Sequence, residues 1–155
     1  TWAFKTFPGV SSDEWSDTEE TNILAKNGNV YLTVEGATFT RNGKTSGGEW
    51  ADVIRGIDWW VAGVRSKVLT LQLAMKKIPY TTAGMDLIAG KIRQQNSEGL
   101  TVGLISPDVE PVVNVPDIGD VPTEDKENRI LKNVTFSWTL AGAIHAVEVT
   151  GSVSA

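Results

Sequence analysis

The spacing of apolar residues predicts a long helix in the middle of the chain. Between positions 49 and 77, apolar side chains recur every three or four residues, which places them in one stripe along a helix. The stripe consists of Trp50, Val53, Ile54, Ile57, Val61, Val64, Val68, Leu71 and Met75. Trp59 falls on the opposite side of the same helix, apart from the residues that are expected to face the core.

A second helix is predicted directly after the first. Pro79 ends the long helix, because a proline ring clashes with the preceding helical turn. The side chain of Thr81 or Thr82 can cap a new helix that runs to about Gln95. We expect these two helices to pack as neighbours.

A shorter helix is predicted near the start, over residues 11–26. Ser11 and Glu14 have the spacing of a capping box, acidic residues crowd the first turns, and Gly28 follows the last one. The residues expected to face the core are Trp15, Ile23 and Leu24.

Alternation of apolar and polar residues predicts the strands. Residues 30–34 and 37–41 alternate on either side of Glu35-Gly36, which indicates a hairpin. Four prolines then punctuate the region after Gly99, which suits an irregular segment. The elements expected beyond that point are an edge strand at 111–115, a short helical turn over PTEDKEN and a strand at 133–140.

The chain is predicted to finish in a hairpin. Ala141-Gly142 is expected to form the turn, and the last strand, around residues 143–153, is expected at a sheet edge. One face of this strand carries Val147, Val149 and Val153. Together the elements predict an α+β fold, in which a mixed sheet with hairpins packs against two or three helices.

The composition is that of a folded globular protein. Of the 155 residues, 41% are hydrophobic and 21% are charged, and a chain of this size buries roughly 68 to 70% of the surface that its unfolded form exposes. We therefore predict a single domain over residues 1–155. The chain has no cysteine, so neither a disulfide framework nor a thiolate metal site is available.

Charge and hydropathy argue against two kinds of partner. The net charge is -5, and lysine and arginine are scattered rather than clustered, which disfavours nucleic acid and anionic lipid. No apolar run approaches the roughly 20 residues of a membrane-spanning helix. We expect neither nucleic-acid binding nor membrane insertion.

No arrangement of residues typical of catalysis stands out. The one histidine, His145, lies in a predicted strand, and no glycine pattern of a nucleophile elbow accompanies it. Two carboxylates could serve a hydrolase, but Asp52 lies one turn from Arg55, where an ion pair on the helix surface explains it. A second acidic group, in a proline-rich loop that lacks the pattern of a calcium site, consists of Asp117, Asp120, Glu124 and Asp125. We predict that the chain is not an enzyme and that it holds no cofactor and no metal.

Five segments together resemble the sheath-like family of contractile-tailed phages. In chain order they are TWAFKTFPGV, AKNGNVYLTVEG, NGKTSGGEW with DVIRGIDWW, KIPYTTAGM and NVTFSWTLAGAIHAVEVTGSV. Each could occur alone by chance, but their common order over nearly the whole chain makes the resemblance specific. Family members are similar in continuing well upstream of a TWAF-type segment, so the resemblance implies a C-terminal fragment of a longer subunit, with the fold of a tail sheath C-terminal domain.

The resemblance also implies a function. Sheath subunits surround the tail tube, and their lattice shifts from an extended, metastable form to a contracted one that drives the tube through the host envelope. The implied partners are other sheath subunits and the tail tube protein, the implied location is the virion tail after assembly in the host cytoplasm, and the isolated fragment is expected to be monomeric. Our candidates for contacts between subunits are Trp59, Val147, Val149 and Val153.

Three other interpretations remain open. The six tryptophans could form a sugar-stacking surface of a carbohydrate-binding tail or adhesin module. A hydrolase would use Asp52 and Asp58, and would need one carboxyl group with a raised pKa in a deep pocket. The chain could also be another structural tail component with a related domain.

Overall fold

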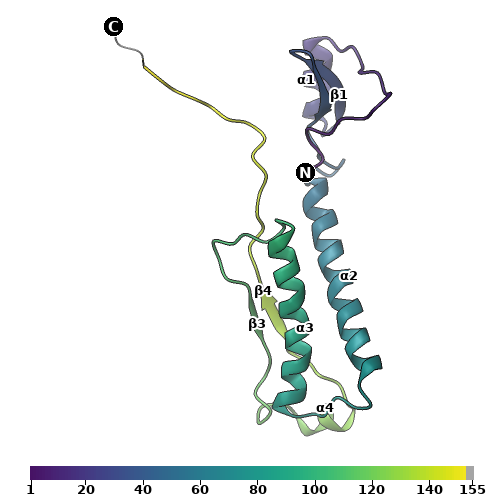
Figure 1. Cartoon of the computed structure of the whole chain (residues 1–155), viewed down its shortest axis with the longest axis vertical. Coiled ribbons are helices and arrows are strands. Elements are labelled where there is room, and N and C mark those ends of the chain that lie inside the picture. Colours follow the sequence, from purple (N-terminus) through teal and green to yellow (C-terminus); the bar gives the residue numbers. More distant parts are fainter. Residues whose placement is uncertain (153–155) are drawn as a thin grey trace. The chain divides into compact units, whose positions relative to one another are not determined.

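The chain folds into two compact units. The computed structural model describes residues 1–152 and has helices with small antiparallel sheets (Figure 1), so the α+β class is confirmed. Unit 1 consists of Thr1–Arg55 with the described residues from Gly142 on, and unit 2 consists of Gly56–Ala141. This division does not test the prediction of one sheath domain, which stays a prediction.

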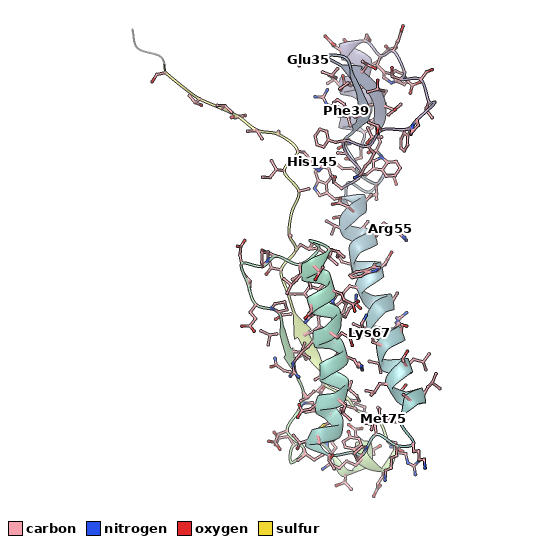
Figure 2. All side chains as sticks on the ribbon, in the orientation of Figure 1. Glu35, Phe39, Arg55, Lys67, Met75 and His145 are labelled. Atoms are coloured by element: carbon pink, nitrogen blue, oxygen red, sulfur yellow. The ribbon has the colours of Figure 1, made fainter. Side chains whose placement is uncertain are left out.

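Unit 1 is built on the predicted hairpin. Strands β1 (Val30–Val34) and β2 (Ala37–Arg41) pair in antiparallel register, with both strands at their predicted bounds. Glu35 and Gly36 connect them (Figure 2), and both have positive φ angles, 50° and 81°. A two-residue turn with two positive φ angles matches the right-handed twist of the strands, so the turn sets the hairpin's register.

The N-terminal segment lies along the outer edge of β2. Phe4 N–H donates to the carbonyl of Thr40 at 2.8 Å, and Thr40 N–H donates to the carbonyl of Lys5 at 2.9 Å. The Thr40 side chain is buried, and its hydroxyl donates to the carbonyl of Trp2. The edge of the hairpin is thereby covered by the chain's own start.

Helix α1 (Asp17–Ala25) begins six residues later than predicted. Its capping box is formed by Ser16 and Glu19, because Asp13 N–H donates to the carbonyl of Tyr31 and ties the preceding residues to β1. Trp15 therefore precedes the helix and is 43% exposed, so its predicted core position is wrong.

Two long helices form the frame of unit 2. Helix α2 (Ala51–Ala74) begins in unit 1 and continues into unit 2, and α3 (Thr82–Thr101) follows after a short connection. In unit 2 they lie side by side, as predicted (Figure 1). The predicted cap of α3 is confirmed, since the Thr81 hydroxyl accepts from Gly84 N–H, but the helix continues past the predicted end at Gln95.

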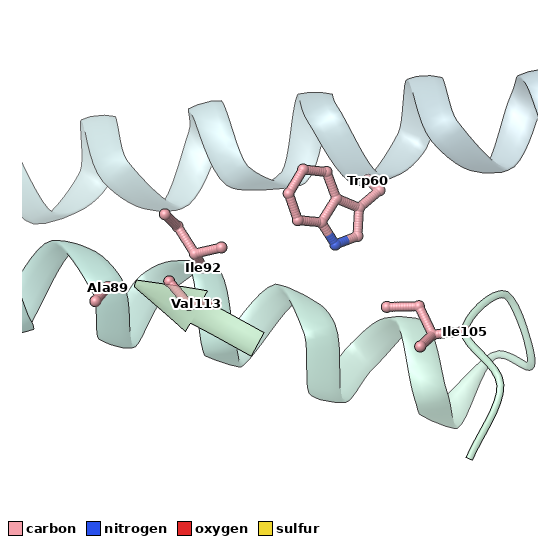
Figure 3. Close-up of a cluster of buried hydrophobic side chains, with 5 residues drawn as sticks. All are labelled: Trp60, Ala89, Ile92, Ile105 and Val113. Carbon is pink, nitrogen blue, oxygen red and sulfur yellow. The ribbon is translucent and has the colours of Figure 1, made fainter. Parts of the chain in front are cut away.

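The core of unit 2 lies between these helices and a small sheet. It consists of Trp60, Ala89, Ile92, Ile105 and Val113 (Figure 3). Trp60 is the one fully buried residue of α2 among the described residues, although the predicted stripe did not include it. Ile57, which the stripe did include, is exposed.

The small sheet pairs β3 (Val112–Asn114) with β4 (Thr135–Ser137) in antiparallel register. The predicted edge strand is confirmed, whereas β4 is shorter than the predicted strand at 133–140. Helix α4 (Thr123–Glu127) forms the predicted helical turn between them. Within residues 1–152, the four strands thus make two separate two-stranded sheets rather than the one mixed sheet that was predicted.

The predicted C-terminal hairpin is wrong for the residues that the structure describes. Residues 141–152 contain neither a turn nor a strand. Within the described chain, the backbone of residues 143–152 donates no hydrogen bond to another backbone group and accepts none. Alternation alone does not make a strand, because a strand also needs a neighbouring edge.

Across residues 1–152, no helix is both long enough and apolar enough to cross a membrane.

Candidate functional site

His145 holds the C-terminal segment against unit 1. Its ring meets Trp50 edge-on at a centroid distance of 4.6 Å and Phe4 at 5.9 Å, both with interplanar angles of 89°, an arrangement that aromatic rings favour. A hydrogen bond of 2.9 Å joins its Nε2 to the Thr1 hydroxyl. With Phe39, labelled beside it in Figure 2, these rings line a cavity of about 390 Å³. His145 therefore has a packing role in unit 1.

The residues after His145 carry the candidate contact valines. Val147 is 77% exposed and Val149 is 88% exposed. Val153 lies outside the described residues. Two β-branched side chains in an extended, unpaired segment are accessible to another chain, and their role as contacts between subunits stays a prediction.

Trp59, the other candidate, lies on α2 beside the buried Trp60. Its side chain is 41% exposed. It belongs to unit 2, whereas the two valines belong to unit 1.

A polar bridge between α2 and α3 was not predicted. Lys67 Nζ donates to Gln95 Oε1 at 2.6 Å and to Glu98 Oε2 at 2.7 Å (Figure 2). Gln95 is fully buried, and Gly63 leaves room for it, since a Cβ on Gly63 would meet the carboxamide. The sequence feature that could have indicated this bridge is Lys67, which directly precedes Val68 at the border of the apolar stripe.

A cavity of about 470 Å³ in unit 2 lies where α2 meets the connection to α3. Its apolar lining includes Met75, labelled in Figure 2, and Ile78, Met85, Ile88, Leu131 and Val134. Three cationic residues also line it, Lys76, Lys77 and Arg129. Because apolar and cationic side chains line it together, this cavity is suited to bind an apolar group with negative charge beside it.

No carboxylate lines either of these two cavities. Asp52 is half-buried in the first turn of α2, and Asp58 is exposed on the same helix. Among residues 1–152, no three His, Asp or Glu side chains form a group that could hold a metal ion. The described structure thus gives the two-carboxylate hydrolase no enclosed site at these cavities.

The comparisons with known proteins point to one family. Residues 51–120 match the family model described as E217 tail sheath protein gp31-like, C-terminal domain. The matched range contains α2, α3 and β3, and of the five segments that carried the resemblance it contains all of KIPYTTAGM and the DVIRGIDWW half of another. A search of curated proteins found no match. The family match, which covers a little under half of the chain, supports a phage tail sheath C-terminal domain and confirms the resemblance to phage tail sheath proteins.

Proposed function

We propose that the chain is part of a structural subunit of a contractile phage tail sheath. The family match of residues 51–120 is the observation that carries this proposal. In this role, copies of the subunit surround the tail tube in stacked rings. The rings move from an extended, metastable lattice to a contracted one, which drives the tube through the host envelope. The partners are other sheath subunits and the tail tube protein, in a tail assembled in the host cytoplasm.

The C-terminal segment supports a connecting role within such a lattice. Residues 143–152 have an unpaired backbone, and their valines at positions 147 and 149 are exposed. A segment of this kind can add as a strand to the sheet edge of a neighbouring subunit, where main-chain hydrogen bonds supply the affinity. Such bonds can persist while the subunits move as rigid bodies.

Immunogold electron microscopy of intact virions tests the sheath role. An antibody raised against this chain is expected to label the whole length of extended tails, and the shortened sheath of contracted tails. Label confined to the tail tip would support a tip component or adhesin instead, and tails without label would exclude the sheath role.

The isolated chain is proposed to act without catalysis and to be mainly monomeric at low concentration. Contraction of a sheath draws on energy stored in the lattice rather than on a catalysed reaction. A ring needs several subunits, and a single chain does not form one by itself. Sedimentation velocity at low concentration checks the second point. Stable rings or tubes formed by this chain alone would contradict it.

One observation favours carbohydrate binding as a second candidate function. Unit 1 exposes two neighbouring aromatic rings, Trp2 and Phe7, 6.1 Å apart between centroids, and the half-buried Tyr31 ring lies 5.2 Å from Phe7. Exposed aromatic rings can stack on sugar rings. Binding of the isolated chain to a glycan array, lost on Trp2→Ala, would support this candidate over the sheath subunit.

A further inference from the structure

The cavity of unit 2 offers a deformable apolar surface. Met75 and Met85 both line it, and methionine side chains adapt to irregular partners. Tyr80 closes one side, where its hydroxyl donates to the carbonyl of Ile130 at 2.9 Å. A bulky apolar group can therefore enter without a matching rigid shape.

The edge of this cavity is cationic. Lys76, Lys77 and Arg129 are exposed, and none of them takes part in an ion pair with the rest of residues 1–152. The chain as a whole carries a charge of -5, so the three cations around this cavity are opposite in sign to the net charge. They favour a partner whose apolar group is flanked by carboxylates.

Arg129 is held at this edge in a backbone conformation that glycine would adopt more easily. It follows α4 with a φ of 58°. Its N–H donates to the carbonyl of Lys126 at 3.2 Å, and Ile130 N–H donates to that of Asp125 at 2.9 Å. This is a Schellman motif, in which glycine is usual at the position of Arg129. An arginine that occupies it despite the strain suggests that its side chain has a use.

Trp15 has the features that this cavity favours. It lies directly before the N-cap Ser16, and an apolar residue at this position commonly packs on the fourth residue of the helix. In α1 the fourth residue is Glu20, which gives the indole no apolar partner. The indole is left 43% exposed. The capping box and the hydrogen bond from Asp13 to Tyr31 hold its backbone in place. Its exposed acidic neighbours, outside every ion pair among the described residues, are Asp13, Glu14 and Asp17.

We propose that Trp15 of one copy of this chain docks in the cationic cavity of a second copy. We name residues 13–17 the acidic plug, and the cavity with Lys76, Lys77 and Arg129 the basic socket. The contact is heterologous, because each copy presents one plug and one socket, so it repeats from subunit to subunit. This inference deepens the proposed sheath role and rests on it, because that role makes a second copy of the chain the expected partner. The two surfaces are chosen because their charges are complementary.

The contact is expected to be small and reversible. One indole and a few charge pairs bury far less than the roughly 1,200 to 2,000 Å² of a stable interface. It is also expected to weaken at high salt, because the flanking charges are exposed and screened. A lattice that changes its subunit packing requires contacts that can be broken and remade.

Complementing variants of the 155-residue chain test the contact. Trp15→Ala removes the plug and keeps the socket. The double variant Lys77→Glu, Arg129→Gly disables the socket and keeps the plug, and glycine suits the positive φ at position 129. Sedimentation velocity at high concentration is expected to show self-association of the wild-type chain, weakened more than about tenfold in each variant. An equimolar mixture of the two variants is expected to form a one-to-one dimer and nothing larger, since one plug and one socket survive.

Thermal melts in which neither variant unfolds at a lower temperature than the wild type exclude unfolding as the cause. A mixture that stays monomeric, or a Trp15→Ala chain that associates as the wild type does, would overturn the plug and socket. If that happened while the antibody still labelled virion tails, the sheath role would stand without this contact. If the mixture formed the dimer but the tails carried no label, the contact would stand and the sheath role would fall.

Discussion

Trp60 Nε1 donates a hydrogen bond of 3.0 Å to Asn96 Oδ1, and both side chains are buried between α2 and α3. The same indole packs on Phe136 at 4.3 Å and on Trp138 at 5.7 Å between ring centroids. One side chain of α2 thus contacts both the second long helix and the small sheet. Because a buried donor without a partner is costly, this bond fixes which face of α2 turns toward α3.

A double-mutant cycle is expected to show this coupling. Asn96→Leu leaves the buried indole N–H without its acceptor, and Trp60→Phe leaves the Asn96 oxygen without its donor, so each should lower the free energy of unfolding by about 2 to 3 kcal/mol. The double variant should cost about 1 to 2 kcal/mol less than the sum, since no unpaired partner remains. Urea denaturation measures all four proteins. Strict additivity would show that the bond contributes no specific coupling.

Two glycines of α3 should respond in opposite directions to the same substitution. A Cβ on Gly84 would collide with the backbone carbonyl of Pro79, whereas a Cβ on Gly90 would meet open space. Gly84→Ala should therefore destabilise unit 2 by about 1 to 3 kcal/mol or more. Gly90→Ala should stabilise the helix by about 0.5 to 1 kcal/mol, because alanine is the better helix former. Thermal unfolding of the pair checks this, and equal effects would mean that the connection between the helices can shift.

The local elements of this fold could be predicted from sequence because their causes are local. The hairpin depends on alternation and on the pair Glu35-Gly36, and both strand bounds were found. The cap at Thr81 is also a short-range feature, whereas α2 ends at Ala74, before the break predicted at Pro79. The start of α1 was missed because Asp13 bonds to Tyr31 of β1, a tertiary contact that overrides a valid capping spacing at Ser11.

The buried face of α2 and the candidate contacts depend on neighbours that periodicity does not specify. Ile57 and Trp60 both fit a helical repeat, and the position of α3 and the small sheet decides that Trp60 is the buried one. The alternation around Val147 and Val149 predicts a strand, but it does not say whether the partner edge belongs to this chain or to another. The use of His145 in packing against Trp50 likewise depends on a contact made across the chain.

The capping box of α1 should make its stability depend on pH. Hydrogen bonds from the Ser16 hydroxyl at 2.7 Å and the Ser16 N–H at 3.0 Å hold the pKa of Glu19 below its usual value of 4.5. The folded pKa is the lower one, so this contribution is fully present above the unfolded pKa and is lost as the pH falls through the folded pKa. In the Glu19→Gln variant, this contribution should be missing from the free energy of unfolding measured as a function of pH on the acidic side. An unchanged pH dependence in that variant would mean that the box does not form in solution.

The last prediction concerns proline at position 149. In the isolated chain, Val149→Pro should leave the melting temperature unchanged, because the backbone of residues 143–152 makes no backbone hydrogen bond within the described chain. In the full-length subunit, it should remove one main-chain donor from any added strand and disturb its register, so sheath tube formation should fall. Val149→Thr is the matched control, since threonine keeps both the N–H and the β-branched shape. Electron microscopy of the two full-length variants, with melts of the two isolated chains, gives the comparison. Normal tubes from the proline variant would exclude the connecting role of this segment, whereas a lowered melting temperature of the isolated chain would show that the segment stabilises unit 1 itself.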